Sequence, residues 1–225
     1  MPCNIGFKSF AKAEIPVPQP QTFKTKAEAP TIDADLLEKL GIEDATFLKW
    51  AQALDTKPLL KEALKRALAK LSVSGVEFQV NDEGVLEASG RYLSATEKRI
   101  LAEQTSLVTD QWQIETLAIV TELLDYTPTI SKNGKELTLV AEEAGKSHPC
   151  DYIKVTKKGG DGSICFEHFK SRSALDLATA KLLLLAHKLG VKIATGKLTV
   201  SEGDPLPSNI QHKHGHYHDG HYHEH

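Results

Sequence analysis

Seven of the ten histidines in this 225-residue chain lie within its last fourteen residues. They alternate with other residues in two runs, which are His212, His214, His216 and His218, then His221, His223 and His225. Imidazole is the commonest side-chain ligand for zinc, nickel and copper, and it is largely neutral near pH 7. Alternate side chains of an extended backbone project to the same side, so neighbouring histidines can chelate one ion. The tail therefore predicts a site for a divalent transition metal.

Other residue types in the tail support metal capture. Gly215 and Gly220 allow the backbone to fold around an ion, and the carboxylates of Asp219 and Glu224 add oxygen donors. In composition the tail resembles the histidine-rich ends of nickel and zinc metallochaperones, although nothing in the rest of the chain resembles those families. Two other interpretations stay open. The tail is a purification device, or it is a natural tract whose metal binding is incidental.

A second set of metal-ligand residue types lies in the body of the chain, at His148, Cys150, Cys165 and His168. Two cysteines and two histidines are the ligand inventory of a structural zinc site. The spacing is not that of a zinc knuckle, and in a strand over 164–169 the side chains of Cys165 and His168 would point to opposite faces. We therefore favour buried cysteines and a surface histidine at these positions.

Motifs for catalysis are missing. The sequence contains no H-E-x-x-H, G-x-S-x-G or G-x-G-x-x-G pattern. Several titratable groups gather in one predicted loop, which makes it the first place to search for an active site: Glu142, Glu143, His148, Cys150 and Asp151. We assign no catalytic residue and do not expect an enzyme.

Composition excludes some classes of function. With 40% hydrophobic and 25% charged residues, the chain has the make-up of a folded soluble protein. A net charge of −3 argues against a nucleic-acid binder, which needs a concentrated positive field. No apolar run approaches the roughly 20 residues that span a bilayer, and the N-terminus lacks a secretory pattern. Three cysteines make no disulfide framework, so we expect a cytoplasmic protein.

Four regions follow from the order of these patterns. They are an extended arm over 1–31, a helical region over 32–72, an α+β core over 73–201, and a linker with the histidine tail over 202–225. In the arm, alternating Pro16, Pro18 and Pro20 favour polyproline II and exclude helix. The arm is either a mobile leader or a segment that wraps a neighbouring subunit.

Short helices with clear caps are expected at the start of the helical region. Asp33 or Asp35 caps the first, which ends at Gly41. Asp44 caps the second, which runs to about Leu54.

Amphipathic character is clearest in a third helix, which Thr56 caps with Pro58 in its first turn. Its apolar residues recur at helical spacing at Leu60, Leu64, Leu68 and Leu71. Its opposite face is basic, through Lys57, Lys61, Lys65, Arg66 and Lys70. We interpret that face as solvated rather than as a binding surface.

Period-two patterns begin after Val76 and predict a hairpin that turns at 81–84. A helix from Ser94 to about Val108 follows, and a second helix starts at Asp110 and is stopped by Pro128.

Asn133 and Gly134 form the strongest short hairpin signal of the chain. A further hairpin turns at 159–162 and leads into a helix from about Ser173 to Leu189, followed by closing strands. The order strand–strand–helix thus occurs twice and suggests two related units. It also fits an ordinary α+β sheet with helices on one face, which we favour.

Two functional hypotheses follow. The first is a non-enzymatic metal-binding or metal-handling protein whose tail takes up zinc, nickel or copper. The alternative is a structural or assembly protein that forms a homo-oligomer through its arm and core, with the tail accessory. Neither hypothesis involves nucleic acid or a membrane.

Overall fold

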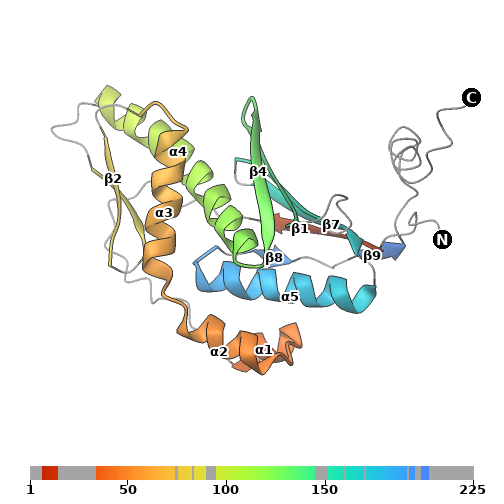
Figure 1. Ribbon diagram of the computed structural model, residues 1–225. Helices are drawn as coiled ribbons and strands as arrows, with labels where there is room; N and C mark the ends of the chain where they lie inside the picture. Colours follow the sequence, from red (N-terminus) through yellow and green to blue (C-terminus); the bar gives the residue numbers. More distant parts are fainter. Residues whose placement is uncertain are drawn as a thin grey trace, which may run out of the picture.

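Helices and antiparallel sheets build the protein, as the α+β prediction requires (Figure 1). The computed structural model describes residues 7–14, 34–73, 76–82, 84–89, 95–144, 152–159, 161–169, 171–191, 193–195 and 199–202. Among these residues, no helix has the length and apolar character needed to cross a membrane.

Seven strands form one antiparallel sheet. They are β1 (Phe7–Glu14), β4 (Tyr126–Asn133), β5 (Glu136–Glu143), β6 (Tyr152–Lys158), β7 (Asp161–Phe169), β8 (Ala194–Thr195) and β9 (Thr199–Glu202). Their order is β4-β5-β6-β7-β1-β8, and β9 pairs with the same edge of β1 as β8. A separate hairpin consists of β2 (Glu77–Val80) and β3 (Leu86–Ser89).

Tight turns join the consecutive strands at the predicted places. Gly134 has a φ of +60° in the β4–β5 turn, and Gly159 has a φ of +61° in the β6–β7 turn. Side chains disfavour this backbone conformation, which explains glycine at both positions. Pro128 does not stop a helix, as we predicted, but lies inside β4. It is tolerated because β4 is an edge strand, where a missing N–H need not break a ladder.

Part of the predicted arm belongs to the protein's own sheet. Phe7–Glu14 is β1, and Phe10 lies opposite Cys165 of β7. Neither a mobile leader nor a segment wrapping another subunit describes these eight residues, so that interpretation was wrong for them. Their partners β7, β8 and β9 lie far away in sequence, which local patterns cannot reveal. The other residues of 1–31, including the alternating prolines, lie outside the described ranges.

Five helices are described, and side chains cap three of them. They are α1 (Ala34–Leu40), α2 (Ala45–Ala53), α3 (Thr56–Ala69), α4 (Ala95–Glu122) and α5 (Arg172–Lys188). Asp44 accepts a hydrogen bond of 2.9 Å from the N–H of Phe47, as its predicted capping role requires. Asp55 rather than Thr56 caps α3, and Ser171 caps α5.

Helix α4 is continuous where we predicted two helices. The expected break at Val108–Asp110 contains neither glycine nor proline, so nothing in the backbone forces one. Asp110 does not cap a new helix. Its carboxylate instead lies 2.7 Å from the ammonium of Lys157 on β6. Asp110 therefore forms an ion pair with the sheet instead of starting a new helix, as its sequence position had suggested.

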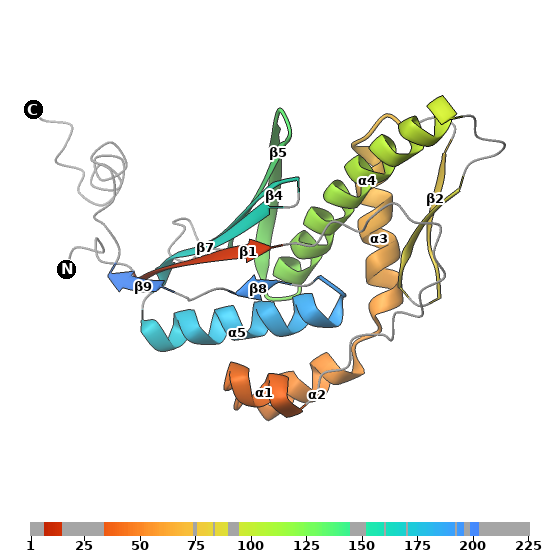
Figure 2. The same cartoon turned by 180° about the vertical axis from the view of Figure 1, so that it is seen from behind.

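One face of the sheet forms the core with α4 and α5. Its buried side chains alternate along three strands and are Leu137, Leu139, Ala141, Ile153, Val155, Ile164 and Phe166. Helix α4 contacts β4 and β5, and α5 contacts β7 and β1. Helices α1 and α2 lie beyond α5, while α3 and the β2–β3 hairpin flank α4 (Figure 2).

An irregularity in β7 adds a second aromatic ring to this core. Two steps of β1, from Phe7 to Ser9, lie opposite three steps of β7, from Phe169 to Phe166. This bulge allows both phenylalanines of β7 to be buried, with ring centroids 6.2 Å apart, although they are three residues apart.

A buried lysine connects α4 to the sheet. The side chain of Lys157 is only 1% exposed, and its ammonium lies 2.7 Å from Asp110 and donates to the carbonyl of Gly159 at 2.6 Å. Removing one partner of a buried pair leaves the other charge uncompensated, which costs far more than losing a surface pair.

We predict that Asp110→Ala lowers the free energy of unfolding by about 3 kcal/mol. Loss of the exposed pair in Asp176→Ala, which leaves Arg172 in water, should cost about 0.5 kcal/mol or less. Urea denaturation of the two variants and the parent measures both values. Equal losses in the two variants would contradict the role assigned to the buried pair.

Candidate functional site

Most of the residues with predicted metal-ligand roles lie outside the described ranges. These are all seven tail histidines, within 203–225, and His148 and Cys150, within 145–151. Of His168, the structure gives only its backbone position in β7. Among the described residues, no group of three or more His, Cys, Asp or Glu side chains is placed to hold a metal ion.

Glu142 and Glu143 belong to a strand, not to the predicted loop. They are the last residues of β5, where they lie opposite Thr127 and Tyr126 of β4. Regular pairing therefore continues further than the loop prediction allowed. The other members of that predicted cluster, His148, Cys150 and Asp151, are outside the described ranges.

Cys165 takes part in a small polar cluster on the sheet. Its thiol is buried and donates to Glu167 Oε1 over 3.2 Å, and the hydroxyl of Tyr152 donates to Glu167 Oε2. Cys165 and Glu167 are two residues apart on β7, and Tyr152 lies opposite Glu167 on β6. Burial, followed by the contact with Glu167, raises the pKa of Tyr152. The phenol therefore stays protonated and serves as a hydrogen-bond donor to the carboxylate.

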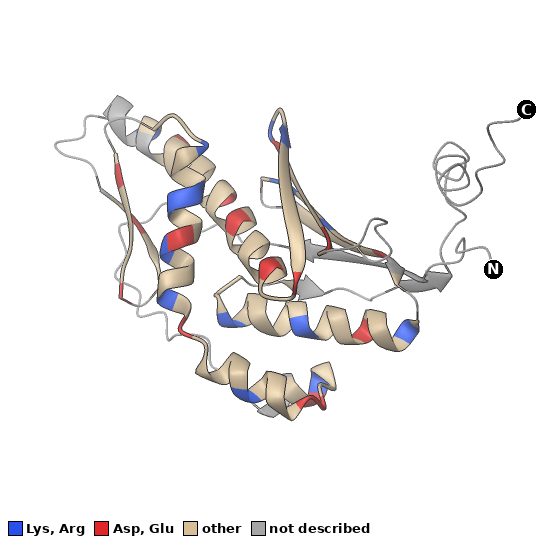
Figure 3. Ribbon diagram, viewed as in Figure 1, with Lys and Arg blue, Asp and Glu red and all other residues tan. Residues whose placement is uncertain are grey.

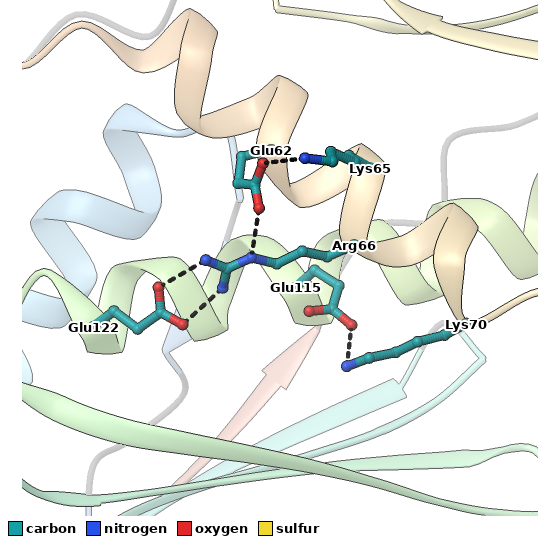
Figure 4. Close-up of polar contacts among 6 residues, drawn as sticks. All are labelled: Glu62, Lys65, Arg66, Lys70, Glu115 and Glu122. Atoms are coloured by element: carbon teal, nitrogen blue, oxygen red, sulfur yellow. Dashed lines mark hydrogen bonds and ion pairs between the residues drawn. The ribbon is translucent and has the colours of Figure 1, made fainter.

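A groove between α3, α4 and β4 gathers charged side chains that the sequence did not mark as a site. It encloses about 280 Å³. Its polar lining consists of Arg66, Lys70, Glu115 and Glu122, and its apolar lining of Ala69, Ala118, Pro128 and Ile130. We call it the α3–α4–β4 groove. Figure 4 shows how its charged residues meet.

Two carboxylates hold the guanidinium of Arg66. Glu122 on α4 accepts from both terminal nitrogens, at 2.7 and 3.1 Å, and Glu62 on α3 accepts from Nε at 3.1 Å. A bidentate contact of this kind sets both distance and orientation. The hydrogen bond to Glu122 is the main cause of the raised pKa of Arg66. Arg66 is therefore a fixed bridge between the two helices.

Glu115 is the most deeply buried charged group of the groove. Its side chain is 2% exposed, and its Oε1 lies 2.7 Å from the ammonium of Lys70 and accepts from Gln111 Nε2 at 2.9 Å. Lys70 is 48% exposed, so the two partners differ greatly in their access to water. The groove thus contains a buried carboxylate whose counter-ion is partly in solvent.

The basic face of α3 is not simply solvated, as we had interpreted it. Arg66 and Lys70 meet acids on α4, and Lys57 pairs with Asp82 in the β2–β3 turn. Figure 3 shows the basic segments of α3 beside acidic segments of α4. Lys65 shows the expected exposure, at 82%. The signal that was missed is the spacing of Glu115 and Glu122, which are two helical turns apart and so share a face of α4.

Comparisons with family models, curated proteins and solved structures found no match to this chain. The inference about function therefore rests on the residues of this chain. The described lining of the α3–α4–β4 groove consists of two cations, two carboxylates and four apolar side chains.

We predict that Glu122→Gln lowers the free energy of unfolding by about 1 kcal/mol, because a bidentate contact that is one-third exposed retains part of its strength. Lys65→Gln on α3 removes only a 3.8 Å contact and should change stability by roughly 0.3 kcal/mol or less. Thermal and urea unfolding of both variants provide the comparison. A loss in Glu122→Gln no larger than in Lys65→Gln would refute the bridge.

Proposed function

We propose that this chain is a non-enzymatic metal-handling protein whose C-terminal tail binds zinc, nickel or copper. The observation that carries the proposal is the density and alternation of seven histidines in residues 212–225. Neutral imidazoles at alternate positions provide several ligands for one ion without a preformed cavity. The interspersed Asp219 and Glu224 add negative charge beside them.

Distance along the chain supports a division of labour between fold and tail. The last strand, β9, ends at Glu202, and His212 follows ten residues later. A segment of that length reaches at most about 35 Å from the sheet. The tail can therefore present a metal ion away from the folded body while remaining attached to it.

In this proposal, the identity of the bound metal depends on which divalent ions are available in the cell. Intrinsic affinity of nitrogen and oxygen ligands rises from nickel to copper and falls again at zinc. The proposal places the protein in the cytoplasm, where available metal decides which ion occupies the tail. The purification-device and incidental-binding interpretations make the same affinity prediction, and a loss of metal tolerance in cells that express a truncated chain would distinguish handling from both.

We predict that truncation after Ile210 removes most zinc or nickel uptake while shifting the melting temperature by less than about 2 °C. The tail lacks the apolar residues of a core, so its metal should not hold the fold together. Binding to the full chain should weaken as pH falls through about 6.5, because protonated imidazole cannot ligate. Titration calorimetry of both chains measures stoichiometry and affinity.

Equal metal stoichiometry in the full and truncated chains would reject the tail as the main site. It would direct attention back to His148, Cys150, Cys165 and His168. A large drop in melting temperature on truncation would show that the tail belongs to the fold or to an interface.

One observation favours assembly as a second candidate function. Ile100 and Leu107 are 42% and 51% exposed, and their spacing of seven residues places them on the same side of α4. Exposed apolar side chains that share a helix face support a contact between copies of the chain.

If this face joins two copies, Leu107→Lys should yield a particle of lower mass, since a charge in an apolar contact opposes association. Ser106→Lys adds the same charge at an exposed position about 100° around the helix from Leu107, so it is a matched control and should reduce the mass less. The measurement is the mass of the native particle for the parent chain and for both variants. A monomeric parent chain would remove the assembly candidate.

A further inference from the structure

We propose that the α3–α4–β4 groove binds a small organic cation, namely a primary ammonium on a short apolar chain. This site is separate from the histidine tail and does not rest on the tail's metal binding. The argument uses the charge balance of the groove, the environment of Glu115 and the apolar walls (Figure 4).

Charged side chains in and around the groove are paired with one another. Three carboxylates, Glu62, Glu115 and Glu122, are matched by three cations, Lys65, Arg66 and Lys70. Glu62 and Glu122 already share the Arg66 guanidinium. An anion at Arg66 would have to displace one of these acids and leave a carboxylate without its counter-ion, which is costly in a partly buried site.

Glu115 supplies the position at which an ammonium would be held. Its side chain is 98% buried and lines the groove. Both of its contacts go to Oε1, and within the described part of the chain Oε2 is assigned neither a hydrogen bond nor an ion pair. A carboxylate oxygen in that situation is an unused acceptor for a charged donor.

Lys70 already shows how a primary ammonium sits there. Its Nζ lies 2.7 Å from Glu115 Oε1, yet the side chain is 48% exposed and therefore retains access to water. Lysine loses considerable rotamer freedom when it is held in one geometry. An external ammonium can bind at Oε2 beside Lys70 or replace it at Oε1, after which Lys70 returns to solvent.

The walls limit what the cation can carry. Ala69, Ala118, Pro128 and Ile130 provide apolar surface for a hydrocarbon chain. A volume of about 280 Å³ equals the liquid volume of roughly nine water molecules, so a chain of about six carbons fits and a large cofactor does not. The combination of one carboxylate and short apolar walls specifies an alkylammonium.

The experiment titrates hexylammonium into the full-length chain at pH 7 with EDTA present, so that no tail-bound metal can capture the amine. We expect saturable calorimetric binding with a dissociation constant of about 1 mM or tighter. Hexanol and hexanoate share the chain length but lack the positive charge, and they should bind at least about tenfold more weakly. Equal binding of all three ligands, or no saturable binding of hexylammonium, would overturn the proposal.

Variants locate the site. Glu115→Gln should weaken hexylammonium binding at least about tenfold, whereas Glu103→Gln, an exposed position on the same helix, should leave it unchanged. Lys70→Ala removes the internal competitor and should strengthen binding several-fold, and Ala69→Phe should abolish it by filling the groove. If Glu115→Gln does not fold, the last two variants decide. Parental affinity in both would reject the groove as the site.

Discussion

Helix α4 is the element on which the rest of the structure depends, because it is buried between the sheet on one side and α3 on the other. Ile114, Leu117 and Val120 are fully buried, and each such side chain contributes about 1.5–3 kcal/mol when it is removed from water. Helix α3 contacts α4 rather than the sheet, so α4 also fixes where α3 and its basic residues lie. The groove exists because of this arrangement.

Burial on several sides forces polar residues of α4 to find partners. Thr116 and Thr121 donate to carbonyls of their own helix, at 2.8 Å each, and so need no help from other elements. Asp110 and Glu115 are charged and require a counter-ion, which β6 and α3 supply as Lys157 and Lys70. Hydrophobic burial therefore brings the layers together, and the ion pairs select how α4 is rotated and placed between them.

The two ion pairs differ in a way that separates structure from binding. Lys157 is 1% exposed and is surrounded by protein, so its contact with Asp110 acts only within the fold. Lys70 is half exposed and lies at a groove, so its contact with Glu115 can be exchanged for another cation. A lysine–carboxylate pair therefore stabilises the fold at Lys157, where protein encloses it. At Lys70, where water reaches the lysine, another cation can compete for the carboxylate.

Local signals in the sequence determined the α+β class and most element positions, and they are the basis of the metal-binding proposal for the tail. Asp44 caps α2 with its own side chain, and Gly134 and Gly190 have positive φ angles where their elements end, so short patterns reveal them. The pairing of Asp110 with Lys157, the inclusion of Phe7–Glu14 in the sheet and the pairing of Arg66 and Lys70 with Glu122 and Glu115 were decided by tertiary structure. The partners are between 45 positions apart, for Lys70 and Glu115, and 195 positions apart, for Phe7 and Glu202. The sequence around a charged residue or a strand carries no signal that identifies so distant a partner.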